Sequence, residues 1–562
     1  FATNVFQATG AIPFAQKSVL SNGTWYKIAV KESGICKLTY DQIKKMGFSN
    51  PSEIRVYGHG GALMSESFLD PYSDDLQEIP LYAGKDYFLF YAQGPIQWKY
   101  AQNRYDFSIN HYSNYGYYFV TDNVGEKKRI SLREPTSNDA YPSKEITSYM
   151  DFQMHKKEEI NLANTGRCWY GDKFTQSYTK SFSFPDFSPE GDAMLYVKST
   201  GFSNYPSTTD VTIRIGDSTQ SSTLQHSLCS GHTMAQEAEE KFSCSPNNGK
   251  MSVTLKFKQN FSSDFATIER IIATMSRPLS MKSGTLFFRT PNKSGEYSNF
   301  KYIVENCNAN TEIWDLSNHN YPQKVEATLS GSTLTFHDFC ETPVREFVAV
   351  DVLSPLHITA QMIGKVENQN LHGEDASDLV IISHPNFLEG AEEIARLHEE
   401  YDDMTTLITT PEKIYNEFSS GTPDATALRY FLKSLYDKNG QKSFYLLLIG
   451  DGCFDNRGIL ASSSTTINNF MITYQSINST DGTKSYVTDD YFAFLADSDV
   501  YTSNSKSKMS ISVGRIPCSS TEQLNGYIQN KLKPHMENKS YGKWKNRIIL
   551  MADDNEASTA YQ

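Results

Sequence analysis

The chain has 562 residues with a net charge of −13, and 13% of its residues are aromatic. This length exceeds what one hydrophobic core usually holds, so we expect roughly two to four domains. The acidic balance argues against a nucleic-acid partner, and no apolar run approaches the roughly 20 residues that span a bilayer as a helix. Because the sequence begins at Phe1 rather than Met, we expect that the N-terminus has been processed or trimmed, so that any signal peptide would not be visible.

The chain up to about residue 375 is predicted to be β-rich. We expect a strand at 25–30, a turn at Gly34 and a short helix near 41–46. A polar, proline-containing segment between 135 and 160 favours a β-rich domain over 1–145 and sandwich-like domains over 146–375. Further strand candidates, several with alternating apolar and polar residues, lie at 86–94, 115–123, 193–202, 210–217, 251–260, 284–290, 332–339 and 346–352.

The chain has eight cysteines, which is sparse for its length. Two pairs in the β-rich part could close loops, namely Cys229 with Cys244 and Cys307 with Cys340. Cys168 has no obvious mate. The composition therefore permits an oxidising compartment without indicating a disulfide pattern.

From residue 376 the pattern changes to short, continuously apolar strands that alternate with helices. Such strands are buried on both faces, which is typical of a mostly parallel α/β sheet. Asp424 is the expected N-cap of the third helix, and Ser519 with Glu522 could form a capping box at the fourth. The expected strands lie at 378–384, 405–410, 444–450, 509–517 and 546–556, and the expected helices at 386–401, 411–418, 424–437 and 519–537.

Polar residues follow several of these strands. In an open parallel sheet, chemistry gathers beyond the carboxyl ends of the strands, which here carry His384, Asp451 and the pair Asp553/Asp554. The alternative interpretation is that they are ordinary turn residues. Cys453, two residues after Asp451, raises the further question of whether it is a nucleophile.

A second acidic cluster lies at 486–501 and contains Asp489, Asp490, Asp497 and Asp499. Alternate aspartates in a loop, together with backbone carbonyls, suit a hard cation such as Ca²⁺. The spacing of Asp497 and Asp499 matches the first arm of an EF-hand loop, but the glycine and the closing glutamate are absent. The alternative is a solvated acidic loop.

The ordered segments 444–452, 486–499, 510–538 and 543–556 together resemble the catalytic domain of the gingipain family of cysteine peptidases. The resemblance covers 376–562, about a third of the chain. The β-rich front, with "WYKIAVKESGICKLTYDQIKKMGF" and "EIRVYGHGGALM", is similar to sortase-type family members of the bacterial type IX secretion system. The implied fold class is multidomain, with β-rich modules followed by a caspase/gingipain-like α/β domain that is incomplete at its C-terminus.

The resemblance implies a cysteine peptidase and transpeptidase on the extracellular face of the outer membrane. Such a sortase removes the C-terminal signal domain of secreted cargo and links the cargo to anionic lipopolysaccharide through a thioester to the enzyme. Its implied partners are an outer-membrane barrel protein and other proteins of the attachment complex. The family's catalytic His and Cys are expected beyond Gln562, so this segment alone is expected to be inactive.

The resemblance also bears on individual residues. It implies a structural Ca²⁺ held by Asp451 with Asp499 and Asp497, and by backbone carbonyls near Leu495 and Tyr501. Cys453 and Cys518 follow the wrong strands to be the nucleophile, so we expect ordinary thiols. The His59-Gly60 dipeptide lies in the β-rich front, where a turn is the better interpretation.

Two other functions remain open. The first is a secreted gingipain-type endopeptidase with an enlarged prodomain, which hydrolyses instead of transferring. The second is a non-catalytic surface scaffold whose gingipain-like domain is degenerate. Residues after 562 would separate the scaffold from the enzymes, and product analysis would separate the two enzymes.

Overall fold

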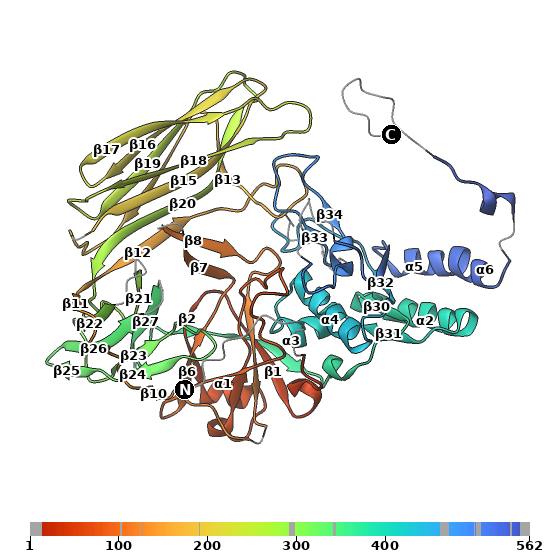
Figure 1. The fold of residues 1–562 in the computed structure, drawn as a ribbon, viewed down its shortest axis with the longest axis horizontal. Coiled ribbons are helices and arrows are strands. Elements are labelled where there is room, and N and C mark those ends of the chain that lie inside the picture. Colours follow the sequence, from red (N-terminus) through yellow and green to blue (C-terminus); the bar gives the residue numbers. More distant parts are fainter. Residues whose placement is uncertain are drawn as a thin grey trace.

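A computed structural model describes most of the chain and shows β-rich modules beside an α/β domain (Figure 1). No helix in the described residues is long and apolar enough to cross a membrane. The described residues are 14–101, 104–123, 125–189, 191–291, 298–340, 344–460, 471–499, 501, 507–539 and 542–550.

Two sheets pack face to face in the N-terminal module. Their inner faces carry a buried apolar cluster that includes Ile28, Leu38, Phe90 and Val120. Helix α1 (Tyr40–Lys45) begins with a capping box between Thr39 and Gln42. One sheet has the order β29 (Gln361–Val366), β1 (Trp25–Val30), β9 (Gly116–Thr121), β3 (Arg55–Tyr57), β4 (Glu78–Ile79), and the other β28 (Ile358–Thr359), β2 (Gly34–Thr39), β6 (Tyr87–Ala92), β5 (Tyr82–Ala83).

Strands from far along the chain complete both of these sheets. β29 pairs antiparallel with β1, and β28 pairs parallel with β2. Between β6 and β9, the chain forms the separate hairpin of β7 (Ile96–Ala101) and β8 (Arg104–Ile109). The segment 358–366 therefore belongs to the sheets of the front module, while the boundaries near 145 and 375 stay a prediction.

The middle module contains two further sheets that enclose an aromatic cluster of Phe288, Tyr302, Phe336 and Phe347. Trp314, which is fully buried, packs with Tyr87 and Tyr91 of the N-terminal module. One sheet has the order β10 (Leu132–Arg133), β24 (Gln323–Val325), β23 (Thr311–Asp315), β27 (Val344–Asp351), β21 (Thr285–Pro291), and the other β11 (Ser143–Ile146), β22 (Ser298–Val304), β26 (Thr333–Cys340), β25 (Thr328–Ser330).

The third module is a sandwich of long antiparallel strands (Figure 1). One sheet has the order β12 (Ser148–His155), β20 (Phe265–Pro278), β15 (Ala193–Phe202), β18 (Gln236–Cys244), with β13 (Gly171–Phe174) on β20, and the other β14 (Ser177–Ser183), β19 (Lys250–Phe257), β16 (Ser207–Ile215), β17 (Ser218–His226). The two central strands of the second sheet, β16 and β19, alternate buried residues with more exposed ones, as half-buried strands do.

The rear of the chain forms an α/β domain with a wholly parallel four-stranded sheet, which confirms the predicted fold class. Pro411 is the first residue of α3 and Asp424 caps α4, both as predicted. The strand order is β31 (Thr406–Thr409), β30 (Leu379–Ser383), β32 (Tyr445–Ile449), β35 (Ser512–Ile516), and the helices are α2 (Leu388–Asp402), α3 (Pro411–Phe418), α4 (Ala425–Lys438), α5 (Thr521–Tyr527) and α6 (Lys533–Met536), with a π-helical turn at Ile528–Leu532.

Three local predictions differ from the structure. The cap of α5 is Ser520 rather than Ser519, because its hydroxyl accepts the N–H of Gln523. The expected last strand is not formed at 546–550. Asn546 ends a 3₁₀ turn, and Ile548 to Leu550 are highly exposed and paired with no strand of the described residues; positions 551–556 lie outside the described residues. Cys229 and Cys244 are free thiols, as is Cys307, and the side chain of Cys340 lies outside the described residues.

Candidate functional site

The carboxyl ends of three parallel strands meet at one edge of the sheet, as their register requires. Backbone N–H groups of His384, Gly450 and Asp451 donate across this edge to Ile449, Ile516 and Cys518 respectively, each at 3.1 Å. The sheet therefore brings His384, Asp451 and Cys518 together. Asp553 and Asp554 lie outside the described residues.

The two cysteines at this edge are not activated nucleophiles. Burial raises the pKa of the Cys453 thiol, whose sulfur accepts the N–H of Asp455 at 3.3 Å. Burial, together with the Asp451 carboxylate, raises the pKa of Cys518 to about 11. No histidine contacts either sulfur in the described part of the chain. A catalytic thiol needs a depressed pKa, which neither environment provides.

Two histidines singled out in the sequence, His59 and His384, lie at turns of the backbone. Gly58 and Gly60 have φ values of +128° and +79°, so the His59 segment is a turn that needs glycine. Burial lowers the pKa of His59 to about 4, and its backbone N–H donates to Ser420 at 3.0 Å. His384 caps a short 3₁₀ turn by accepting the N–H of Asn386.

A cavity of about 290 Å³ opens beside His384 at the same edge of the sheet. Half of its ten lining residues are tyrosines or prolines, which suits a pocket for a partly apolar group. One wall, Tyr112, comes from the N-terminal module, so the front of the chain helps to shape this edge. The lining residues are Tyr112, His384, Pro385, Pro411, Glu412, Tyr415, Pro423, Asp455, Asn456 and Ile472.

The aspartates proposed as calcium ligands have protein partners instead. Asp497 forms an ion pair with Lys433 at 2.7 Å. The carboxylate of Asp499 accepts the N–H of Ala496 at 2.9 Å. Asp489, in the same acidic segment, forms a bidentate pair with Arg515 at 2.6 and 2.7 Å.

Asp451 is not joined to these aspartates in a ligand set. Its backbone carbonyl accepts the N–H of Met471, and its N–H is bound to Cys518. In the ranges that the structure describes, no three His, Cys, Asp or Glu side chains are grouped so that they could hold a metal ion. The arrangement therefore does not fit the expected calcium site.

The β-sandwich module contacts the loops that follow β32 through side-chain and backbone interactions. The ring of Trp169 stacks on Phe454, with 6.0 Å between centroids, and Glu158 pairs with the buried Arg457 at 2.7 Å. A second loop, 476–485, is held by backbone bonds: Arg167 donates to Ser476 at 2.9 Å and Met234 to Thr480 at 2.7 Å. The loops at the carboxyl edge are thus positioned from outside the α/β domain.

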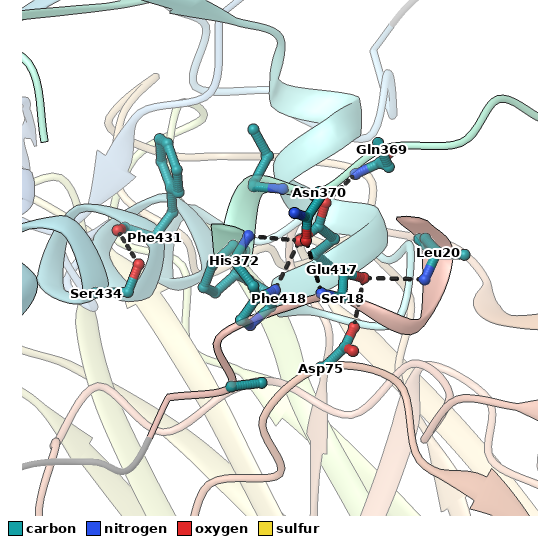
Figure 2. Close-up of polar contacts among 12 residues, drawn as sticks. Ser18, Leu20, Asp75, Gln369, Asn370, His372, Glu417, Phe418, Phe431 and Ser434 are labelled. Atoms are coloured by element: carbon teal, nitrogen blue, oxygen red, sulfur yellow. Dashed lines mark hydrogen bonds and ion pairs between the residues drawn. The ribbon is translucent and has the colours of Figure 1, made fainter. Parts of the chain in front are cut away.

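A buried histidine joins the N-terminal module to the α/β domain (Figure 2). The ring nitrogens of His372 lie 2.6 Å from Glu417 and 2.9 Å from Asp74, and the ring stacks on Phe418. Burial alone would lower the pKa of His372, but the two carboxylates raise it to about 9. Sequence reasoning missed this residue because its partners, at 74 and 417, are remote in the chain.

Comparisons with known proteins agree with this architecture. Residues 372–562 match the family model of peptidase family C25. Dimeric latent PorU from Porphyromonas gingivalis superposes with a TM-score of 0.84 at 25% identity, over 95% of this chain and 51% of that one. The chain therefore spans about half the length of the PorU structure, and the predicted resemblance is confirmed.

Two carbohydrate-binding modules also match, with low TM-scores. A carbohydrate-binding module CBM36 in complex with calcium and xylotriose and a CBM35 module from Cellvibrio japonicus each match at 11% identity with TM-scores of 0.14 and 0.15. They cover 21% and 23% of this chain and 97% of each module, and no argument is drawn from them. No curated protein matches the chain.

Proposed function

We propose that this chain, with its PorU-like fold and C25 domain, acts as part of a cell-surface cysteine peptidase and transpeptidase. The observation that carries the proposal is the match to latent PorU over 95% of the chain, together with the C25 match over 372–562. The proposed activity is that of a type IX secretion sortase. It releases the C-terminal signal domain of secreted cargo and passes the new carboxyl end to anionic lipopolysaccharide.

The proposed cleavage and transfer steps require a thiolate nucleophile and an imidazole that transfers protons. The thiolate attacks the scissile carbonyl, a C–S bond forms, the C–N bond breaks, and the imidazole protonates the departing amine. An amine of the acceptor then attacks the thioester, an amide forms, and the thiol is regenerated. The resemblance implies that the nucleophile and the imidazole lie after residue 562, and the raised pKa values of Cys453 and Cys518 are consistent with this.

One structural observation favours this proposal over a gingipain-type endopeptidase with a removable prodomain. The front modules hold the α/β domain through buried contacts, such as His372 with Asp74 and Lys27 with Asn416. A prodomain that must depart would have to break each of them. The endopeptidase remains the second candidate, since it needs the same domain.

The proposed setting is the outer face of the outer membrane, beside a barrel protein and other attachment-complex proteins. The proposal is tested with the native protein. We expect an intact mass well above 63.5 kDa and iodoacetamide labelling of a cysteine after residue 562. Mass spectrometry of cleaved cargo should then find its new C-terminus amide-linked to the acceptor.

The other outcomes are equally informative. Cargo that ends only in a free carboxylate would favour the endopeptidase. Cargo that stays intact, with no labelled cysteine after residue 562, would overturn the enzymatic proposal in favour of a scaffold.

A further inference from the structure

Lys433 is a fully buried cation that joins helix α4 to the acidic loop. Its ammonium lies 2.7 and 2.8 Å from the two carboxylate oxygens of Asp437 and 2.7 Å from an oxygen of Asp497. Lys433 is 0% exposed. The two Asp437 oxygens accept hydrogen bonds from this ammonium and the Asp497 oxygen adds an ion pair. Burying the charge is tolerable only because it is paired.

Arg429, one helical turn earlier, binds the backbone of the same loop. Its guanidinium donates to the carbonyls of Phe494 at 2.8 Å and Asp499 at 2.9 Å. A third N–H donates to the carbonyl of Glu66 in the N-terminal module at 2.6 Å. Backbone carbonyls of a loop are groups that Ca²⁺ commonly takes as ligands, and here a buried arginine takes them.

The Asp499 carboxylate is used inside the loop itself. It accepts the N–H of Ala496, while the Asp499 N–H donates to the Ala496 carbonyl, both at 2.9 Å. These two bonds close a tight turn. Two of the three carboxylates expected to surround a metal, those of Asp497 and Asp499, are therefore held by donors of the protein.

We propose that Lys433 and Arg429 replace a calcium ion as the cations that hold the acidic loop 494–499, so that the folded domain does not require calcium. A divalent ion between Asp437 and Asp497 would have to displace the Lys433 ammonium or lie beside it, and like charges repel. The (i, i+4) spacing of Lys433 and Asp437 on α4 fixes the geometry before the loop docks.

This inference is independent of the peptidase activity and is tested on the 562-residue chain. Thermal unfolding is followed in excess EDTA and in millimolar calcium chloride. We expect the two Tm values to agree within about 1 °C, because a ligand that binds only the folded state raises its stability. Calorimetric titration with calcium chloride should show no stoichiometric site.

A substitution tests the cation directly. Lys433→Met keeps the length of the side chain but removes its charge. We expect its Tm to fall by at least roughly 3 °C, since carboxylates around a buried position lose their partner. Lys413→Met, at an exposed position on α3, is the matched control and should leave Tm unchanged.

Several results would overturn the proposal. One is a Tm that drops on chelation, or a one-to-one calcium site that Asp497→Asn abolishes. Another is a Lys433→Met protein as stable as its control. If Lys433→Met does not fold, Asp497→Asn serves instead: a lower Tm supports the ion pair, and an unchanged Tm rejects it.

Discussion

The two faces of the parallel sheet are covered in different ways. On one face, α3 and α4 pack in a core that also takes Phe68 and Tyr112 from the N-terminal module. On the other face, α2 and α5 pack in a core made only of residues from the α/β domain itself. The first face is an interface between modules, and the second is an ordinary helix layer.

The difference is visible in the helices. Every residue of α4 from Ala425 to Leu435 is buried, whereas α2 buries a single stripe that includes Ile394 and Leu397. The polar residues of α4 are not on a solvated face: Arg429 and Lys433 are 0% exposed. An interface between modules can thus bury a side of a helix that would face water in an isolated domain.

Phe68→Ala should have the largest effect, because it empties the shared core. Phe68 packs edge-on against Tyr430, and the Arg429 guanidinium lies 4.1 Å from the centre of its ring. We expect the free energy of unfolding to fall by about 3–5 kcal/mol. Urea denaturation measures this loss, and hydrogen exchange should rise in α4 and in the N-terminal module together. Leu69→Ala, at an exposed neighbour, is the control, and equal losses would contradict the shared core.

The pH dependence of stability tests the same face through His372. Its pKa is about 9 when folded, above its usual unfolded value of about 6.5. The stabilisation is therefore complete below about pH 6.5 and is lost as the pH rises through 9, by roughly 3 kcal/mol in total. Urea denaturation at several pH values should show this decline in the parent and not in His372→Gln. The same decline in His372→Gln would contradict this role. The control is His398→Gln, on α2, which should show the same decline of stability with rising pH as the parent.

On the second face, Gly390→Ala should cost about 1 kcal/mol. Its Cβ would overlap the buried Cδ2 of Leu524, and this overpacking outweighs the better helix propensity of alanine. Increased hydrogen exchange should stay within α2 and α5. The control is Gly526→Ala, where the new methyl would lie 4.0 Å from the Asn530 amide nitrogen without overlap and should stabilise by about 0.5–1 kcal/mol. Increased exchange in the N-terminal module would contradict the separation of the two faces.

The smallest effect on activity is expected from substituting the two thiols, Cys453 and Cys518, at the carboxyl edge of the sheet. In the native protein, Cys453→Ser and Cys518→Ala should each leave the cargo cleavage rate within about twofold, because neither thiol is activated. The rate is measured by mass spectrometry of released signal domain. A loss of activity in either variant would place the nucleophile at this edge instead.

Elements with a clear local pattern were predicted well from the sequence. β1, β15 and α3 begin and end at the predicted residues. The long strand β20 was missed because Glu269 and Arg270 interrupt its apolar run. In the structure these charges are paired with Lys156 at 2.9 Å and Asp106 at 2.6 Å, partners that are remote in the sequence.

In the candidate site, too, contacts between residues that are remote in the sequence could not be predicted. The carboxyl edge could be predicted because the ends of parallel strands coincide, and the structure places the predicted His384 and Asp451 there, with Cys518 beside them. The cations that meet the acidic loop could not, since Arg429 and Lys433 lie on a helix more than one element away. Local spacing shows which oxygens are present but not which donors reach them.

The pairing of β1 with β29 constrains how the protein can be made. Trp25 is the partner of Val366, so a nascent chain must extend past residue 366 before its first strand has both neighbours. Until then the edge of β1 is open to other unfinished chains, a known route to aggregation during synthesis. A truncation before residue 361 should therefore yield insoluble protein even though every strand of the first 121 residues is intact.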